Sequence, residues 1–207
     1  MAISTWLSDN WIEVFGAVTG IIFVFLEIRQ NLWLWPVGII TSAVYIWVFY
    51  TGKLYADMSL QGYYLVISVI GWYWWRRGEK EKGRRGEGEN RRKGDEEKVK
   101  LRVTRINNRL ALILLITFAI LYTTMYLILS RLTDSPVPAA DSFVTSLSII
   151  ATWMLARKIY EHWYLWVIVN SVSCILFLTR DLYATVILYA VYCIMSLVGL
   201  REWKKSL

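Results

Sequence analysis

The sequence predicts an all-α protein that crosses a membrane several times. Of its 207 residues, 57% are hydrophobic and 15% are aromatic, and the mean hydropathy is +0.42. A soluble domain of this length could not bury so much apolar surface in one core. A helix needs about 20 apolar residues to span the hydrocarbon of a bilayer. Seven apolar runs reach roughly that length, at residues 11–29, 32–51, 56–75, 109–130, 139–159, 163–180 and 182–200.

The third and the seventh of these runs resemble each other. Residues 54–75, "LYADMSLQGYYLVISVIGWYWW", align without a gap with residues 182–203, "LYATVILYAVYCIMSLVGLREW", and 8 of 22 positions are identical. Paired Tyr, Gly and Trp residues at one offset are harder to obtain by chance than apolar matches. With one short gap upstream, the "LW" at 34–35 also pairs with the "LW" at 165–166. Spans one to three and five to seven are therefore predicted to be two copies of a three-helix unit.

This repeat predicts how the chain is divided. Residues 1–75 form the first repeat, 76–108 a charged cytoplasmic loop, 109–130 a linker helix, and 131–207 the second repeat. One helix between the copies gives both the same orientation. Parallel repeats are a transporter architecture, and the substrate site is expected near the midplane between them.

Basic residues are unevenly placed and predict the orientation. Of the 23 Lys and Arg residues, 14 lie between Arg76 and Arg109, mixed with seven acidic residues and several glycines and without aromatics to stack on bases. This segment is expected to be a solvated, flexible linker beside anionic lipid, not a nucleic-acid site. With it in the cytoplasm, 20 basic residues lie inside and three outside. The N-terminus is therefore predicted outside and the C-terminus in the cytoplasm.

Three residues near the start of the sixth run are the first candidates for a site. Trp163, Trp166 and Asn170 share one helical face, because they are three and four residues apart. An amide in hydrocarbon is unfavourable without a hydrogen-bond partner. The face is predicted to line a substrate cavity. The alternative is that the tryptophans belong to the interfacial belt and Asn170 bonds a neighbouring helix.

Further candidates lie in the third and seventh runs. Gln61 and Tyr64 share a face near mid-depth, and the repeat places Tyr189 and Tyr192 at equivalent positions, although tyrosines in a helix can also simply pack. Aromatic faces with amide and hydroxyl groups suit a flat, cationic ring that carries a polar arm. They suit a phosphorylated ligand poorly, because no Lys or Arg is expected at mid-depth.

The sequence carries no pattern expected of an enzyme. His162 is the only histidine and stands at the start of a span, and no metal-binding, nucleophile or phosphate-loop motif is found. No cofactor is expected. The alternative from a different class is a membrane scaffold or receptor in which the aromatic residues only pack.

At these positions the sequence resembles the PnuC family of vitamin transporters. The resemblance covers essentially all seven spans, and its motifs are Trp163-x-x-Trp166-x-x-x-Asn170, Gln61-x-x-Tyr64, Gly71-Trp72-x-x-Trp75 and the segment 31–50. It implies a 3+1+3 helix fold related to sugar transporters of the SWEET type. It also implies facilitated uptake of nicotinamide riboside across a bacterial inner membrane, with a cytoplasmic kinase that traps the substrate by phosphorylation.

The resemblance leaves the vitamin open. Close relatives move thiamine or riboflavin, and thiamine also pairs a cationic aromatic ring with a neutral polar arm. The amide of Asn170 favours nicotinamide riboside, and thiamine is the alternative substrate. The resemblance also points to a homo-oligomer, a trimer.

Overall fold

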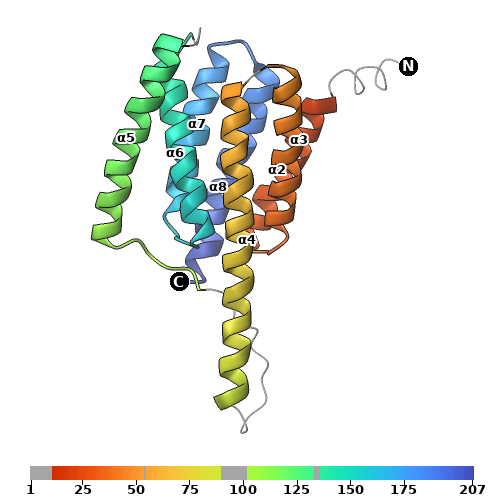
Figure 1. Cartoon of the computed structure of the whole chain (residues 1–207), viewed down its shortest axis with the longest axis vertical. Coiled ribbons are helices and arrows are strands. Elements are labelled where there is room, and N and C mark those ends of the chain that lie inside the picture. The colour runs from red at the N-terminus through yellow and green to blue at the C-terminus, as the bar shows by residue number, and fades with distance from the viewer. Residues whose placement is uncertain (1–10, 54, 90–101, 133–135) are drawn as a thin grey trace. The chain divides into compact units, whose positions relative to one another are not determined.

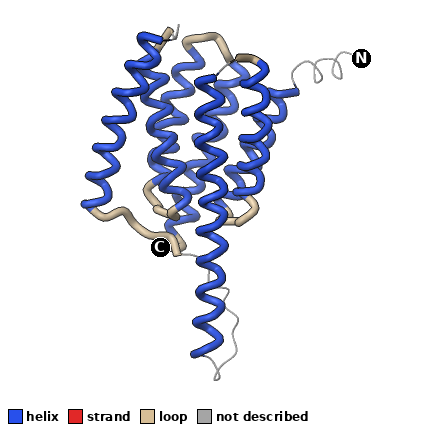
Figure 2. The backbone as a smooth tube through the Cα atoms, in the orientation of Figure 1, coloured by secondary structure: helices blue, strands red, loops and turns tan. Residues whose placement is uncertain are grey.

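The computed structural model describes residues 11–53, 55–89, 102–132 and 136–207, and these are almost entirely helical (Figure 1, Figure 2). The described residues hold seven helices: α2 (Trp11–Ile28), α3 (Leu34–Thr51), α4 (Tyr55–Glu89), α5 (Asn108–Leu132), α6 (Pro138–Ala156), α7 (His162–Leu178) and α8 (Tyr183–Lys204). Within these ranges, the β-type pairing consists of one isolated parallel bridge between Thr104 and Ile159. The predicted all-α fold class is confirmed.

Each helix coincides with one of the seven apolar runs. Apart from the end of α4, the boundaries differ from those expected by four residues or fewer. Five helices, α2, α3, α5, α6 and α8, are long and apolar enough to cross a membrane. The apolar helix α7 has 17 residues, and α4 combines an apolar first half with a charged second half. That α4 and α7 also cross the membrane stays a prediction.

The charged segment after position 75 differs from the expectation of a flexible linker. Helix α4 continues to Glu89, while residues 90–101 lie outside the described part of the chain. Lys, Arg and Glu are good helix formers, whereas the interspersed glycines are poor ones. The helix therefore takes in part of the segment that was expected to be a linker, and the role of the whole segment as a cytoplasmic loop stays a prediction.

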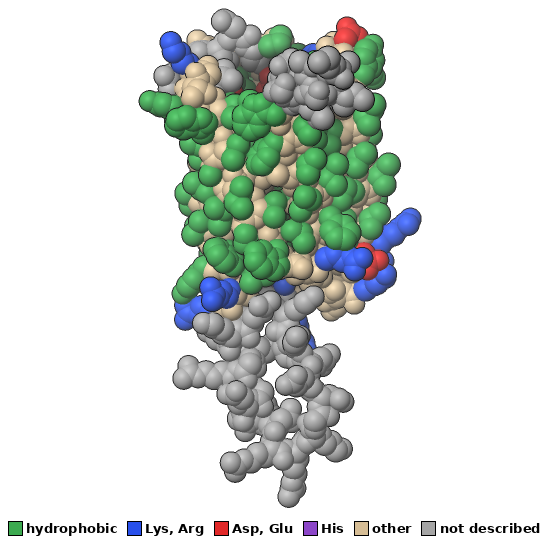
Figure 3. Space-filling view, turned by 90° about the vertical axis from the view of Figure 1, so that its right-hand side faces the viewer, with side chains coloured by type: hydrophobic (Ala, Val, Ile, Leu, Met, Phe, Trp, Pro, Cys, Tyr) green, Lys and Arg blue, Asp and Glu red, His purple; other side chains and the backbone are tan. Residues whose placement is uncertain are grey.

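The helices expose many large hydrophobic side chains. Leu115 on α5 and Ile187 on α8 expose 63% and 66% of their surface. Figure 3 shows hydrophobic side chains spread over the helices, with most of the visible Lys and Arg toward the lower end and some at the upper end. Exposed apolar surface on this scale indicates a lipid environment.

The chain forms two compact units, Met1–Tyr73 and Trp74–Leu207. In the first, α2 packs against α3. In the second, α5 packs on α6, α6 on α7 and α7 on α8. Helix α5 is held by a buried cluster of Ile150, Met154 and Ile159, against which its leucines pack. The division into repeats, loop and linker helix at the expected boundaries stays a prediction.

Two turns of the first unit recur in the second, 128 residues later. Gln30 and Lys158 have φ values of 51° and 53°, and Lys53 and Asp181 have φ values of 58° and 56°. A positive φ is uncommon outside glycine. Across the described ranges, these four are the non-glycine residues that adopt it, and they form two pairs at the same offset. The turns that join consecutive helices are therefore built alike in both units.

This geometry corrects one detail of the expected alignment. Without any gap, residues 30–75 align with 158–203 and 13 of 46 positions are identical. Trp35 then corresponds to Trp163, and the gapped pairing of 34–35 with 165–166 is wrong. Twelve tryptophans make a chance "LW" match easy, whereas the turn conformations are sensitive to register.

Candidate substrate site

The predicted face of α7 is turned toward protein. Trp163 and Asn170 expose 0% and 5% of their surface, and Trp166 is half-buried. The three lie on one uninterrupted helix, where their spacing aligns them. Buried polar groups on this face need partners, and their partners decide what the face can bind.

The side chain of Asn170 is oriented by α8. Its Nδ2 donates to Ser196 Oγ at 3.1 Å, and the Ser196 hydroxyl donates to the Tyr192 carbonyl at 2.8 Å. Because the Ser196 hydroxyl donates its hydrogen to that carbonyl, its oxygen can only accept the hydrogen bond from Asn170. The amide nitrogen therefore points at α8, and Oδ1 is an acceptor that Ser196 does not use. A helix neighbour thus bonds Asn170, as the alternative interpretation expected, but it uses only one of the amide's groups.

Trp163 is packed tightly against α8. A Cβ placed on Gly199 would lie 2.4 Å from the Trp163 ring, and the ring meets Trp203 edge-on at a centroid distance of 5.8 Å. Its aromatic neighbour His162 lies 4.8 Å away. Trp163 therefore fixes how α7 lies on α8, whatever else it contacts.

The indole N–H of Trp166 is a donor without a partner in the described part of the protein. Its nitrogen is buried, so bulk water does not reach it. Trp166 precedes Asn170 by four residues, one helical turn. The indole N–H of Trp163, on the same face, is also buried without a partner in the described residues, so this face carries two unused donors beside the Asn170 amide.

The two candidate tyrosines of α8 form an aromatic group with α7. The rings of Tyr189 and Tyr192 meet edge-on at 5.8 Å, and Tyr189 packs against Phe177 at 5.2 Å. Both tyrosines are half-buried. The structure therefore brings five of the seven predicted residues onto the adjacent helices α7 and α8.

The other two predicted residues belong to the first unit. Gln61 and Tyr64 are half-buried on α4, and Tyr64 meets Tyr63 at a ring distance of 5.6 Å. By the ungapped alignment, their counterparts in the second unit are Tyr189 and Tyr192. Their role in binding stays a prediction.

The buried side chains of the turn before α7 have a structural role. His162 is fully buried, and its Nδ1–H donates to the Ile159 carbonyl at 2.6 Å. Burial raises the pKa of the Tyr160 phenol above its usual 10.0, and a hydrogen bond with Tyr164 acts in the same direction. No group of His, Cys, Asp or Glu residues that could hold a metal is found in the described ranges.

Sequence reasoning missed two hydroxyl groups. Ser196 orients Asn170, and its match with Ser68 in the repeat was a signal that it faces protein. Ser146 on α6 is fully buried, and its Oγ has no partner in the described residues. Other α6 hydroxyls, such as that of Ser142, bond the carbonyl one turn earlier. A serine-rich stretch in an apolar helix was the available signal for Ser146.

Apolar helices in two units, with polar groups buried between adjacent aromatic helices, define a multi-pass membrane transporter. The chain belongs to the nicotinamide mononucleotide transporter family, whose model matches residues 10–205. This is a family of transporters and not of enzymes, and the protein is a multi-pass protein of the inner membrane. The resemblance found in the sequence is confirmed.

Several relatives cover nearly the whole chain. It is 24% identical to the nicotinamide riboside transporter PnuC of Escherichia coli, over 95% of this chain and 86% of that protein. It is 27% identical to the riboflavin/roseoflavin transporter RibM of Streptomyces davaonensis, over 93% and 84%. The crystal structure of the vitamin B3 transporter PnuC has the same fold, with a TM-score of 0.72 and 22% identity over 99% of this chain and 85% of that one.

Proposed function

We propose that this protein carries nicotinamide riboside across the inner membrane by facilitated diffusion. The observation that carries the proposal is the oriented amide of Asn170 with the unpartnered indole N–H of Trp166 one turn before it. A primary carboxamide offers a carbonyl acceptor and an N–H donor side by side. Its carbonyl would accept from the buried Trp166 N–H, which is unfavourable without a partner, and its N–H would donate to Asn170 Oδ1.

The aromatic residues support a flat, cationic ring. Tyr189, Tyr192 and Phe177 supply ring faces on α7 and α8, and aromatic faces attract a cation such as a pyridinium. Neither α7 nor α8 carries a Lys or Arg before Arg201. Phosphate recognition ordinarily uses such residues, so the riboside fits these helices better than its phosphorylated form.

The remaining parts of the proposal follow from the family. Gln61 and Tyr64 would complete the substrate contacts from the first repeat. A cytoplasmic kinase would trap the vitamin by adding a charge that the carrier does not accept. The protein would act as a homo-oligomer within the lipid bilayer.

Two other vitamins are candidates. Thiamine shares the cationic ring and the polar arm, and its amino group could donate to Asn170 Oδ1. Riboflavin is favoured by the relative that transports it. Both also place a donor beside an acceptor, in the aminopyrimidine of thiamine and the imide edge of riboflavin, but riboflavin lacks the cationic ring. A scaffold or receptor without transport is the candidate from a different class.

Titration of the purified protein with nicotinamide riboside, thiamine and riboflavin, followed by tryptophan quenching, tests the proposal. Saturable binding and liposome uptake of nicotinamide riboside are expected, and Asn170→Ala should weaken the binding and abolish the uptake. Ser171→Ala is the matched control, because the neighbouring Ser171 is exposed and its hydroxyl bonds the Val167 carbonyl. Preference for another vitamin would overturn the substrate, and absence of any saturable binding would favour the scaffold.

A further inference from the structure

The residues just before and just after the charged segment both contact one short turn of the second unit. This turn, residues 157–161, joins the end of α6 at Ala156 to the start of α7 at His162. Residues 102–107, called the return segment here, follow the charged segment and precede α5. Each side reaches the turn through groups that the substrate site does not use.

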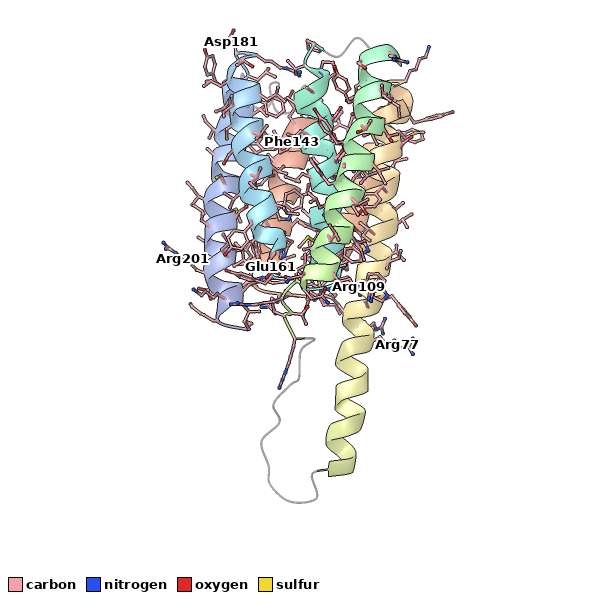
Figure 4. All side chains as sticks on the ribbon, turned by 90° about the vertical axis from the view of Figure 1, so that its left-hand side faces the viewer. Arg77, Arg109, Phe143, Glu161, Asp181 and Arg201 are labelled. Atoms are coloured by element: carbon pink, nitrogen blue, oxygen red, sulfur yellow. The ribbon has the colours of Figure 1, made fainter. Side chains whose placement is uncertain are left out.

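The return segment makes three hydrogen bonds to the turn. The Thr104 N–H donates to the Lys158 carbonyl at 3.0 Å, and the Tyr160 N–H donates to the Thr104 carbonyl at 2.9 Å. The Ile106 N–H donates to the Glu161 carboxylate at 3.0 Å. Val103 is buried beside these bonds, with 6% of its surface exposed. Figure 4 shows Glu161 and Arg109 at the same end of this unit.

The end of α4 that belongs to this unit holds the same turn. Trp75 Nε1 donates to the Ala156 carbonyl at 3.2 Å, and Lys158 Nζ lies 4.0 Å from the centre of the Trp75 ring. Arg157 lies over the Trp74 ring at 4.1 Å. Such cation–π contacts strengthen when the cation is desolvated, and Lys158 is 2% exposed.

The turn leads directly into the proposed site. His162 donates to the Ile159 carbonyl and packs at a tilt against Trp163, which in turn packs on Gly199. A displacement of the turn would therefore move the first residues of α7. The equivalent turn of the first unit, around Gln30, has no such β-bridge in the described residues.

We propose that the return segment is a positioning element for transport: by bonding the turn, it holds the start of α7 and so controls how fast the carrier changes state. This rests on the transport function proposed above. Thr104 and Glu161 touch no predicted substrate group. Their loss should therefore change the turnover of the carrier and leave its affinity for the vitamin unaltered.

Two pairs of variants separate positioning from folding. Thr104→Pro removes the N–H that bonds Lys158, whereas Thr104→Ala keeps it. Glu161→Ala removes the acceptor for Ile106, whereas Glu161→Gln keeps a carbonyl oxygen there. Thr104→Pro and Glu161→Ala should each speed amide hydrogen exchange of residues 157–166 by roughly five- to tenfold, as loss of one hydrogen bond worth about 1–1.4 kcal/mol would. Their maximal uptake rate should fall severalfold with the Kd unchanged, and both controls should behave as the unmodified protein.

Each outcome decides the inference. Normal uptake despite faster exchange, unchanged exchange, or a Kd and thermal stability that worsen together with uptake would each overturn it. If Thr104→Pro does not insert, the two Glu161 variants decide alone. If the unmodified protein carries no nicotinamide riboside, the proposed substrate fails, and uptake of whichever vitamin it carries replaces that readout. If it carries none, no turnover exists for the segment to control, and the inference is overturned along with the proposed function.

Discussion

The indole ring of Trp163 occupies the space in which a side chain at Gly199 would begin. A Cβ at position 199 would lie 2.4, 2.5 and 2.6 Å from three atoms of this ring. The first unit repeats the relationship 128 residues earlier, where a Cβ on Gly71 would lie 2.3 Å from the Trp35 ring. The shared Trp and Gly residues of the two units are thus partners in one packing arrangement.

Gly199→Ala should destabilise the protein by about 1–3 kcal/mol, because a rigid buried ring must move to admit the methyl group. Gly71→Ala should have a similar effect through Trp35. The midpoint of thermal unfolding in detergent, followed by tryptophan fluorescence, measures both. Gly62→Ala is the control, since a Cβ there would meet nothing within 4 Å. It should be neutral or gain up to about 1 kcal/mol of helix propensity; equal losses in all three variants would contradict the packing argument.

Ser196→Ala should weaken vitamin binding about fivefold, because it releases the amide of Asn170 from its fixed orientation. Since Ser196 acts through Asn170, the double variant Asn170→Ala/Ser196→Ala should bind no worse than Asn170→Ala alone. Isothermal titration of the four proteins completes the cycle. Strictly additive losses would show that Ser196 contacts the ligand itself.

Trp166→Phe should reduce affinity for nicotinamide riboside by about tenfold, because it removes a hydrogen-bond donor and keeps an aromatic ring. Trp47→Phe serves as the control, because Trp47 lies on α3 and exposes 68% of its surface. Binding assays on both variants give the comparison. An unchanged Kd for Trp166→Phe would remove the indole N–H from the proposed carboxamide contact.

The charge bias predicts that the C-terminus is cytoplasmic and that the turn around Asp181 is outside. Figure 4 places Asp181 at the end of the second unit opposite to Arg201. In a cysteine-free background, Asp181→Cys should react with an impermeant thiol reagent added to whole cells. Ser206→Cys should react only after the membrane is opened. The reverse pattern would invert the orientation.

The pKa of Tyr160 predicts how stability depends on pH. Because burial raises this pKa above 10.0, the folded protein keeps a proton that the unfolded chain loses. The phenol's contribution is therefore complete below pH 10 and is lost as the pH rises through the raised pKa. Unfolding midpoints between pH 8 and about 11 should fall less steeply for Tyr160→Phe than for the unmodified protein. Identical slopes would show that Tyr160 ionises equally in both states.

Much of the fold was predictable because it depends on local composition. Apolar runs of the length of a bilayer specify helices wherever they occur, so seven helices appear where they were expected. The repeat was visible because Gly199 and Trp203, which both pack against Trp163, have identical counterparts at the same spacing in the first repeat. The helical extension of α4 to Glu89 was not expected from the glycines and charges of this stretch.

By itself, the sequence determined the class of protein, the approximate helices and the face of α7 that carries Asn170. Only the tertiary structure decided the state of each polar group on that face. The orientation of the Asn170 amide depends on Ser196, 26 residues away, and the burial of Trp163 depends on Gly199. Hydrogen bonds and close packing are properties of pairs of residues, and helix packing brings together pairs that spacing along the chain does not specify.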